Sequence, residues 1–137
     1  MSGSTGLAGV REREYGPVVT IHLQGLQTAI HPTSDLAAAK PWWTTQLGIE
    51  PYFDQPVYVG FSVAGYELAL MPDADPVDGV LTYWGVEDVA RAVSDLLAEG
   101  AQEHTPPADV GDGITTAAVR TPDGNVLGLI HNPHFAL

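Results

Sequence analysis

The chain has 137 residues, of which 17 are acidic and 5 basic, with a formal net charge of −12 at pH 7 and no cysteine. A surface of this sign repels nucleic acid and anionic membranes, because phosphate binding depends on clustered lysine and arginine. A chain without cysteine forms no disulfide, no zinc–thiolate site and no thiol nucleophile. The hydrophobic fraction of 45% is ample for the packed interior of one domain, or of two half-domains that share a core.

The first segment, residues 1–16, begins with Gly, Ser and Thr and then reads Arg-Glu-Arg-Glu. It lacks the apolar stretch of a signal peptide, and no other segment is long and apolar enough to span a bilayer. We therefore expect a flexible N-terminal arm over residues 1–16 and a cytoplasmic protein without a membrane partner.

Two parts of the chain follow the same pattern, 53 positions apart. Each has an apolar extended run, then an aspartate (Asp35 or Asp88), then an alanine-rich stretch. Aspartate is a favoured N-cap because its carboxylate accepts hydrogen bonds from free backbone N–H groups and complements the helix dipole. The pattern predicts a strand followed by a helix in each half of the chain.

The first predicted helix covers Leu36–Leu47 and ends at Gly48, and the second covers Val89–Glu99 and ends at Gly100. Both carry apolar residues at helical spacing, and glycine is a common residue just after a helix. Pro41 lies inside the first helix and lacks a backbone N–H, so we expect a kink there.

Strand-like runs follow each helix: Val57–Val63 and Tyr66–Met71 in the first half, Thr115–Arg120 and Asn125–Ile130 in the second. The second pair is joined by Thr-Pro-Asp-Gly, which suits a type I turn. A half of this size leaves one sheet face exposed, so we expect the two halves to combine around a shared interior. The alternative is a coincidental similarity between two unrelated halves.

This organisation predicts a first module over residues 17–72, a linker over 73–79 and a second module over 80–137. The acidic run within the linker, Asp73–Asp78, is interpreted as a solvated connection.

The order strand, Asp, helix, Leu-Gly resembles the vicinal-oxygen-chelate superfamily of glyoxalase, bleomycin-resistance and extradiol-dioxygenase-like proteins. So does the C-terminal signature, Asp109-Val-Gly-Asp-Gly-Ile followed by Thr121-Pro-Asp-Gly-Asn-Val-Leu-Gly-Leu-Ile-His-Asn-Pro-His-Phe. The resemblance covers roughly residues 18–135. It implies an α+β fold in which two βαβββ modules form an open, cup-shaped mixed sheet with helices on the outside, commonly as a homodimer.

The resemblance also implies where a metal would be held. Metalloenzymes of the superfamily place ligands on the first and last strand of each module, where the metal polarises substrate oxygens. The matching positions in this chain are Thr28, Ala69, Leu81 and Gly128. Three of these side chains have no lone pair, and a single Thr hydroxyl is a poor ligand for a divalent ion. We therefore expect no metal and no other cofactor, and neither glyoxalase I nor ring-cleaving dioxygenase activity. A shift of two residues would bring only Glu67 to one of these positions.

Alternation along the strands predicts which side chains face the cup. The inward-facing set is Thr28, Ile30, Glu67, Ala69, Met71, Leu81, Tyr83, Val126, Gly128 and Ile130. The opposite parity, with Leu68, Leu70, Leu127 and Leu129, is expected to pack under the helices. A mostly apolar cavity with a few polar groups suits a small organic ligand.

Single residues of this set each allow two interpretations. Glu67 is either an inward carboxylate that orients or transfers a proton, or a residue at the wet end of its strand bonded to backbone. Tyr83 either donates a hydrogen bond to a ligand or belongs to the core. Trp42 is free to stack on a planar ligand, whereas Trp43 and Trp84 are better explained as core residues.

The histidines are scattered along the chain. An unorthodox metal site is an alternative for four of them: His22, His31, His131 and His134. His104 stands beside Pro106-Pro107 and is interpreted as solvated loop surface. The run Asp109–Gly113 lacks the ligands of a calcium loop and is interpreted as a glycine-rich turn near the rim of the cup.

These patterns favour a metal-independent protein that binds a small organic molecule, with sequestration of an antibiotic as one role of such binding. One alternative is a metal-independent isomerase, lyase or cyclisation enzyme in which Glu67 or Tyr83 transfers protons. A second alternative is a glyoxalase-like metalloenzyme with a relocated histidine site. The residues expected to contact the ligand are Thr28, Ile30, Trp42, Glu67, Ala69, Leu81, Tyr83 and Gly128.

Overall fold

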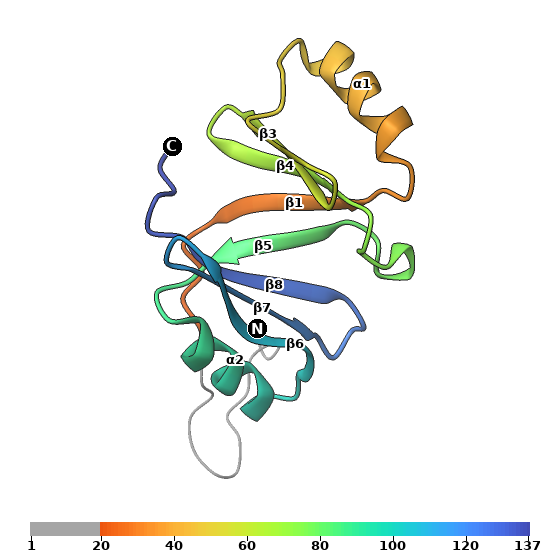
Figure 1. Ribbon diagram of the computed structural model, residues 1–137. Helices are drawn as coiled ribbons and strands as arrows, with labels where there is room; N and C mark the ends of the chain where they lie inside the picture. Colours follow the sequence, from red (N-terminus) through yellow and green to blue (C-terminus); the bar gives the residue numbers. More distant parts are fainter. Residues whose placement is uncertain (1–19) are drawn as a thin grey trace, which may run out of the picture.

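The computed structural model describes residues 20–137, so the arm expected over residues 1–16 lies outside the described part of the chain. Two α-helices, eight strands and one 3₁₀ turn follow one another along it (Figure 1). In chain order they are β1 (Leu26–Pro32), α1 (Leu36–Leu47), β2 (Phe53–Gln55), β3 (Tyr58–Val63), β4 (Tyr66–Met71), η1 (Pro76–Asp78), β5 (Leu81–Gly85), α2 (Val89–Ala98), β6 (Gln102–Gly111), β7 (Ile114–Arg120) and β8 (Val126–His131).

All eight strands form one open mixed sheet in the order β2-β3-β4-β1-β5-β8-β7-β6. Strand β1 runs parallel to β4 and antiparallel to β5, and β5 runs parallel to β8. Each half of the chain is therefore a βαβββ module, and in this structure the two modules meet within one chain along β1 and β5, where Ile30 is opposite Leu81. The predicted α+β architecture is confirmed.

Both helices begin at the predicted residues; α1 ends at Leu47 as predicted, and α2 ends at Ala98, one residue before the predicted end at Glu99. The carboxylates of Asp35 and Asp88 each accept a hydrogen bond from the backbone N–H three residues further on, at 3.1 Å and 3.0 Å. Gly48 ends α1 in the left-handed conformation (φ 71°), and its N–H donates to the Thr44 carbonyl at 2.9 Å. Pro41 is accommodated inside α1, which is one helix over its whole length.

The core is divided between the two faces of the sheet. Under α1, the buried side chains of Val59, Phe61 and Leu70 contact the helix, and under α2 Leu129 belongs to a second buried cluster. Leu68 and Leu127 join these clusters too, so the parity predicted for the helix side is confirmed. Each such burial stabilises the fold by about 1.5–3 kcal/mol.

The other face, which we call the helix-free face, carries the third cluster. Its buried members are Ile30, Ala69, Ala74 and Leu81, with Tyr58, Met71, Tyr83 and Val126 packed against them. This is the face predicted to line the cup, and the alternation of side chains along the central strands places it there.

The interpretation of His104 as solvated loop surface is wrong. His104 lies in β6, the last strand of the sheet, and its half-buried ring places Nε2 2.9 Å from Asp78 Oδ2. Pro106 and Pro107 are tolerated because β6 is an edge strand with an irregular register against β7. The run Asp109–Gly113 comprises the end of β6 and a tight turn at Asp112 and Gly113 that leads into β7, so the glycine-rich turn predicted for this run is found at its last two residues.

The interpretation of the linker as solvated is wrong at its last acidic residue. The Asp78 side chain is only 11% exposed, and Oδ1 accepts a hydrogen bond from Arg120 Nη2 at 3.0 Å. The hydrogen bonds from Arg120 and then His104 lower the pKa of Asp78 below its ordinary value. The linker is thus attached to β6 and β7 of the second module.

No helix within residues 20–137 combines the length and the apolar character needed to cross a membrane.

Candidate functional site

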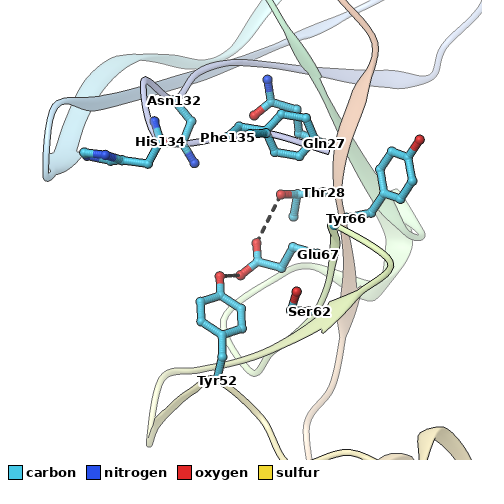
Figure 2. A pocket seen from close by; sticks show the side chains of 11 residues that line it. Gln27, Thr28, Tyr52, Ser62, Tyr66, Glu67, Asn132, His134 and Phe135 are labelled. Carbon is cyan, nitrogen blue, oxygen red and sulfur yellow. Dashed lines mark hydrogen bonds between the residues drawn. The ribbon is translucent and has the colours of Figure 1, made fainter.

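A pocket of about 410 Å³ opens on the helix-free face, beside the turn between β3 and β4 (Figure 2). Its walls come from β1, β3, β4, the segment before β2 and the C-terminal segment after β8. The lining residues are Gln27, Thr28, Tyr52, Ser62, Gly65, Tyr66, Glu67, Asn132, His134, Phe135 and Ala136. With histidine neutral, the carboxylate of Glu67 is the one formal charge among these lining side chains.

Glu67 is held by hydroxyl groups from three different segments. Its neighbour on β1, Thr28, donates to Oε1 at 3.1 Å, and Tyr58 donates to the same oxygen at 2.7 Å. The hydroxyl of Tyr52 donates to Oε2, as Figure 2 shows. Glu67 is therefore an inward carboxylate near the start of β4, bonded to side-chain hydroxyls. Three of its roughly four acceptor positions are occupied.

The two tyrosines remain protonated donors under physiological conditions. Burial raises the pKa of Tyr52, and the hydrogen bond to Glu67 and its negative charge raise it further. Burial also raises the pKa of Tyr58, followed by the charge of Glu67. Burial alone raises the pKa of Tyr83 on the same face. Each hydroxyl therefore keeps its proton and serves as a hydrogen-bond donor or as part of the wall.

Gln27 enters the pocket through an irregularity in β1. Between Leu26 and Thr28 the register against β5 shifts, because these residues pair with the consecutive Trp84 and Tyr83. Gln27 is the extra residue of this β-bulge, and it lines the pocket together with Thr28. Bulges commonly re-aim a side chain in this way next to functional sites.

The C-terminal segment closes one side of the pocket. The ring of Phe135 lies 6.4 Å from that of Tyr66, and Leu137 approaches the turn at Gly65 so closely that a Cβ atom on that glycine would be 3.0 Å from it. Asn132 and His134 stand across the pocket from Glu67 in Figure 2. The pocket thus combines an aromatic wall with a polar one.

The predicted site residues divide into three groups. Thr28 and Glu67 line the pocket. On the same face, Ile30, Ala69, Leu81 and Tyr83 belong to the neighbouring apolar cluster, and Gly128 is beside Tyr83, where a Cβ atom would be 2.6 Å from the tyrosine ring. Trp42 is 56% exposed on α1, which covers the opposite face, so the structure does not bring it to the pocket.

Sequence reasoning missed Gln27, Tyr52, Tyr58 and Gly60 as parts of this site. Gly60 lies inside β3, where a Cβ atom would be 2.6 Å from Glu67 Oε2. A glycine within a strand is a signal for such close approach, and this one was available in the sequence.

The four positions where relatives would hold a metal do not fit a divalent ion here. Ala69 and Leu81 are buried in the apolar cluster, Gly128 has no side chain, and the hydroxyl of Thr28 donates to Glu67. Within residues 20–137, no three His, Asp or Glu side chains lie close enough together to hold a metal.

The histidines proposed for the alternative metal site do not lie close to one another. The ring of His31 packs edge-on against Trp43 on the α1 side, at 5.5 Å between centroids. His131 Nδ1 lies 3.3 Å from the Val86 carbonyl oxygen, whereas His134 belongs to the pocket. The structure therefore does not assemble a shared histidine site from them.

An open sheet of two βαβββ modules, with a pocket on the face away from the helices, is the architecture of the vicinal-oxygen-chelate proteins. The family model of the Glyoxalase/Bleomycin resistance protein/Dioxygenase superfamily matches residues 25–129, and the chain belongs to this superfamily. No curated protein gives a significant match.

Solved structures share the fold at low identity. A single-substitution variant of methylmalonyl-CoA epimerase from Streptomyces coelicolor, in complex with 2-nitronate-propionyl-CoA, is 15% identical with a TM-score of 0.67, covering 85% of this chain and 99% of the epimerase. A glyoxalase/bleomycin resistance protein/dioxygenase superfamily member from Vibrio splendidus 12B01 is 18% identical with a TM-score of 0.58, covering 82% and 100%. At these identities the likeness concerns the fold alone.

Proposed function

We propose that the chain binds a small, positively charged organic molecule in the pocket beside Glu67, without a metal ion. The observation that carries this proposal is the Glu67 carboxylate, fixed by three hydroxyl groups and the one formal charge among the residues that line the pocket. A carboxylate held in this way is ready to accept a charge-assisted hydrogen bond without reorganisation.

The surroundings of Glu67 favour a cation with an apolar body. The rings of Tyr66 and Phe135 offer apolar contact and attract cations at their faces. The net charge of −12 adds a long-range attraction that speeds the encounter with a cation. Sequestration of a cationic antibiotic is a biological role that such a pocket would serve.

The metal-independent part of the proposal rests on the donor set. The positions Thr28, Ala69, Leu81 and Gly128 offer one hydroxyl, and it is engaged with Glu67. Recognition in this chain therefore depends on its own hydrogen-bonding groups.

Benzylamine, which is a cation at pH 7 with an aromatic ring, is a suitable probe for titration calorimetry and for amide NMR. We expect saturable binding with shifts at Gly65 and Phe135, and a loss of affinity of about tenfold or more in Glu67→Gln, since the negative charge that strengthens the hydrogen bond to the cation is removed. Glu87→Gln, which removes the same charge from an exposed position before α2, is the matched control and should keep the affinity. Equal affinities of the two variants would refute the proposal.

A metal-independent enzyme is the second candidate, because Glu67 faces an open pocket that a substrate can enter. The fold is shared with an epimerase, which is an enzyme class that moves protons. Glu67→Gln separates the two functions: a catalyst loses turnover and keeps ligand affinity, whereas a binding protein loses affinity.

We also propose that the chain forms a homodimer, as the superfamily resemblance implies. Native mass spectrometry reports the subunit number, and a strictly monomeric mass at micromolar concentration would contradict this proposal.

A further inference from the structure

Gln27 is a buried polar side chain whose acceptor oxygen lacks a hydrogen bond from residues 20–137. It is only 6% exposed, it lines the pocket, and its amide oxygen has no hydrogen-bond partner within the described part of the chain. Among the side chains of residues 20–137, this oxygen is the one buried polar atom in that condition. Buried polar groups are nearly always paired, because an unpaired one forfeits its hydrogen bonds to water.

Two irregular features of the fold make room for this amide. The β-bulge turns Gln27 toward the pocket, beside Thr28. On the facing strand, Gly85 lacks a side chain, and a Cβ atom there would be 2.5 Å from Gln27 Nε2. A bulge and a glycine thus both accommodate a group whose oxygen gains no hydrogen bond from the described residues, 20–137.

Two acceptors therefore stand on adjacent strands of one pocket. Thr28 lies between them, next to Gln27 along β1 and opposite Glu67 on β4. The terminal torsion of a glutamine is broad, so the amide can turn its oxygen toward a donor in the pocket at little cost.

We propose that Gln27 determines specificity in this pocket. Glu67 pairs with the positive charge of the bound cation, and the amide oxygen of Gln27 accepts a hydrogen bond from one of the N–H groups of that cation. The ligand class is therefore a primary or secondary ammonium or an amidinium, and quaternary ammonium compounds are disfavoured. This inference rests on the proposed function, namely that the pocket binds an organic cation.

The first test uses two probes of equal charge, benzylamine and benzyltrimethylammonium, which share the ring and differ in whether the nitrogen carries N–H donors. The wild-type chain should prefer benzylamine, and Gln27→Met should reduce that preference about threefold to tenfold, the effect of one hydrogen bond. Glu67→Gln should lower the affinity for both probes.

The outcomes separate the two proposals. If neither probe shifts the amide resonances of Gly65 and Phe135, the proposed function fails and this inference fails with it. If both probes bind the wild-type chain and Gln27→Met keeps the same preference, the inference alone is overturned.

The second test needs no ligand. Methionine matches glutamine in length and has no unpaired oxygen, so Gln27→Met should raise the Tm of the free protein by about 2–6 °C. Gln102→Met, at an exposed position of β6, is the control and should change the Tm little. A lower Tm of Gln27→Met, or failure to fold, would show that the amide has a structural role and would overturn the inference.

Discussion

Gly60 on β3 stands where any side chain would meet the carboxylate of Glu67 on β4. A Cβ atom at position 60 would be 2.6 Å from Glu67 Oε2 and 3.0 Å from the ring of Tyr52. The backbone of the same residue also pairs with Tyr52, whose N–H donates to the Gly60 carbonyl at 3.0 Å. The position of the carboxylate therefore depends on a missing side chain in the neighbouring strand.

We expect Gly60→Ala to push Glu67 away from Tyr52, because the backbone of β3 is paired on both sides and gives way less readily than a side chain. The free energy of unfolding should fall by about 1–3 kcal/mol, as in other overpacked sites. Benzylamine affinity should fall together with it. Denaturant unfolding and calorimetry measure the two effects, and an unchanged affinity would contradict the role given to this glycine.

The Tyr58 hydroxyl should contribute to stability through Glu67. Tyr58→Phe removes a donor at 2.7 Å from a charged acceptor, so we expect a loss of about 1–3 kcal/mol in the free energy of unfolding. The matched control is Tyr66→Phe, since Tyr66 is exposed at the start of β4, and it should change stability by less than about 0.5 kcal/mol. Equal effects of the two substitutions in urea denaturation would argue against the hydroxyl network.

Asp78 should make the stability of the fold depend on acid pH. Because its pKa is lowered in the folded chain, its contribution is fully present above the unfolded pKa, roughly pH 4, and is lost as the pH falls through the folded value. Asp78→Asn should therefore destabilise the protein at pH 7, and the difference from the wild-type chain should shrink as the pH is lowered toward about 2. Thermal unfolding between pH 7 and about pH 2 measures this difference in stability, with Asp73→Asn in the linker as the control. A difference that stays constant with pH would contradict the prediction.

Trp42 should not contribute to ligand binding, although its exposed ring suggested stacking on a planar ligand. It lies on α1, against Trp43 at 5.0 Å between ring centroids, and α1 covers the face opposite the pocket. Trp42→Ala should leave benzylamine affinity within about twofold of the wild-type value, because nothing within reach of the pocket changes. A large loss of affinity would place the binding site elsewhere.

Much of the fold follows from local rules that can be applied to the printed sequence. The N-caps at Asp35 and Asp88, the helix end at Gly48 and the strand Tyr66–Met71 are where the patterns predicted them. The two edge strands were not located from the sequence, because β2 is only three residues long, and the two prolines and irregular register of β6 conceal the alternation that identifies a strand.

The pocket was harder to predict, because its parts are joined by pairing rather than by sequence spacing. Alternation correctly turned Thr28 and Glu67 to one face, but strict alternation would place Gln27 on the other, because it takes no account of the extra residue in this strand. Tyr52 and Tyr58 reach Glu67 only because β3 pairs with β4 in a particular register.

The sequence by itself determined where both helices begin, where α1 ends and which apolar face lies under each helix, since these depend on residue type and on periods of about 2 and 3.6 residues. The four strand positions at which a metal would be held came from the resemblance to the superfamily, and the residue types at those positions are read directly from the sequence. Only the tertiary structure decided which hydroxyls hold Glu67, that Gln27 enters the pocket unpaired, and that the C-terminal segment closes it. The reason is physical: strand register, a bulge and the docking of a chain end are set by contacts between residues distant in the sequence, and no local pattern encodes them.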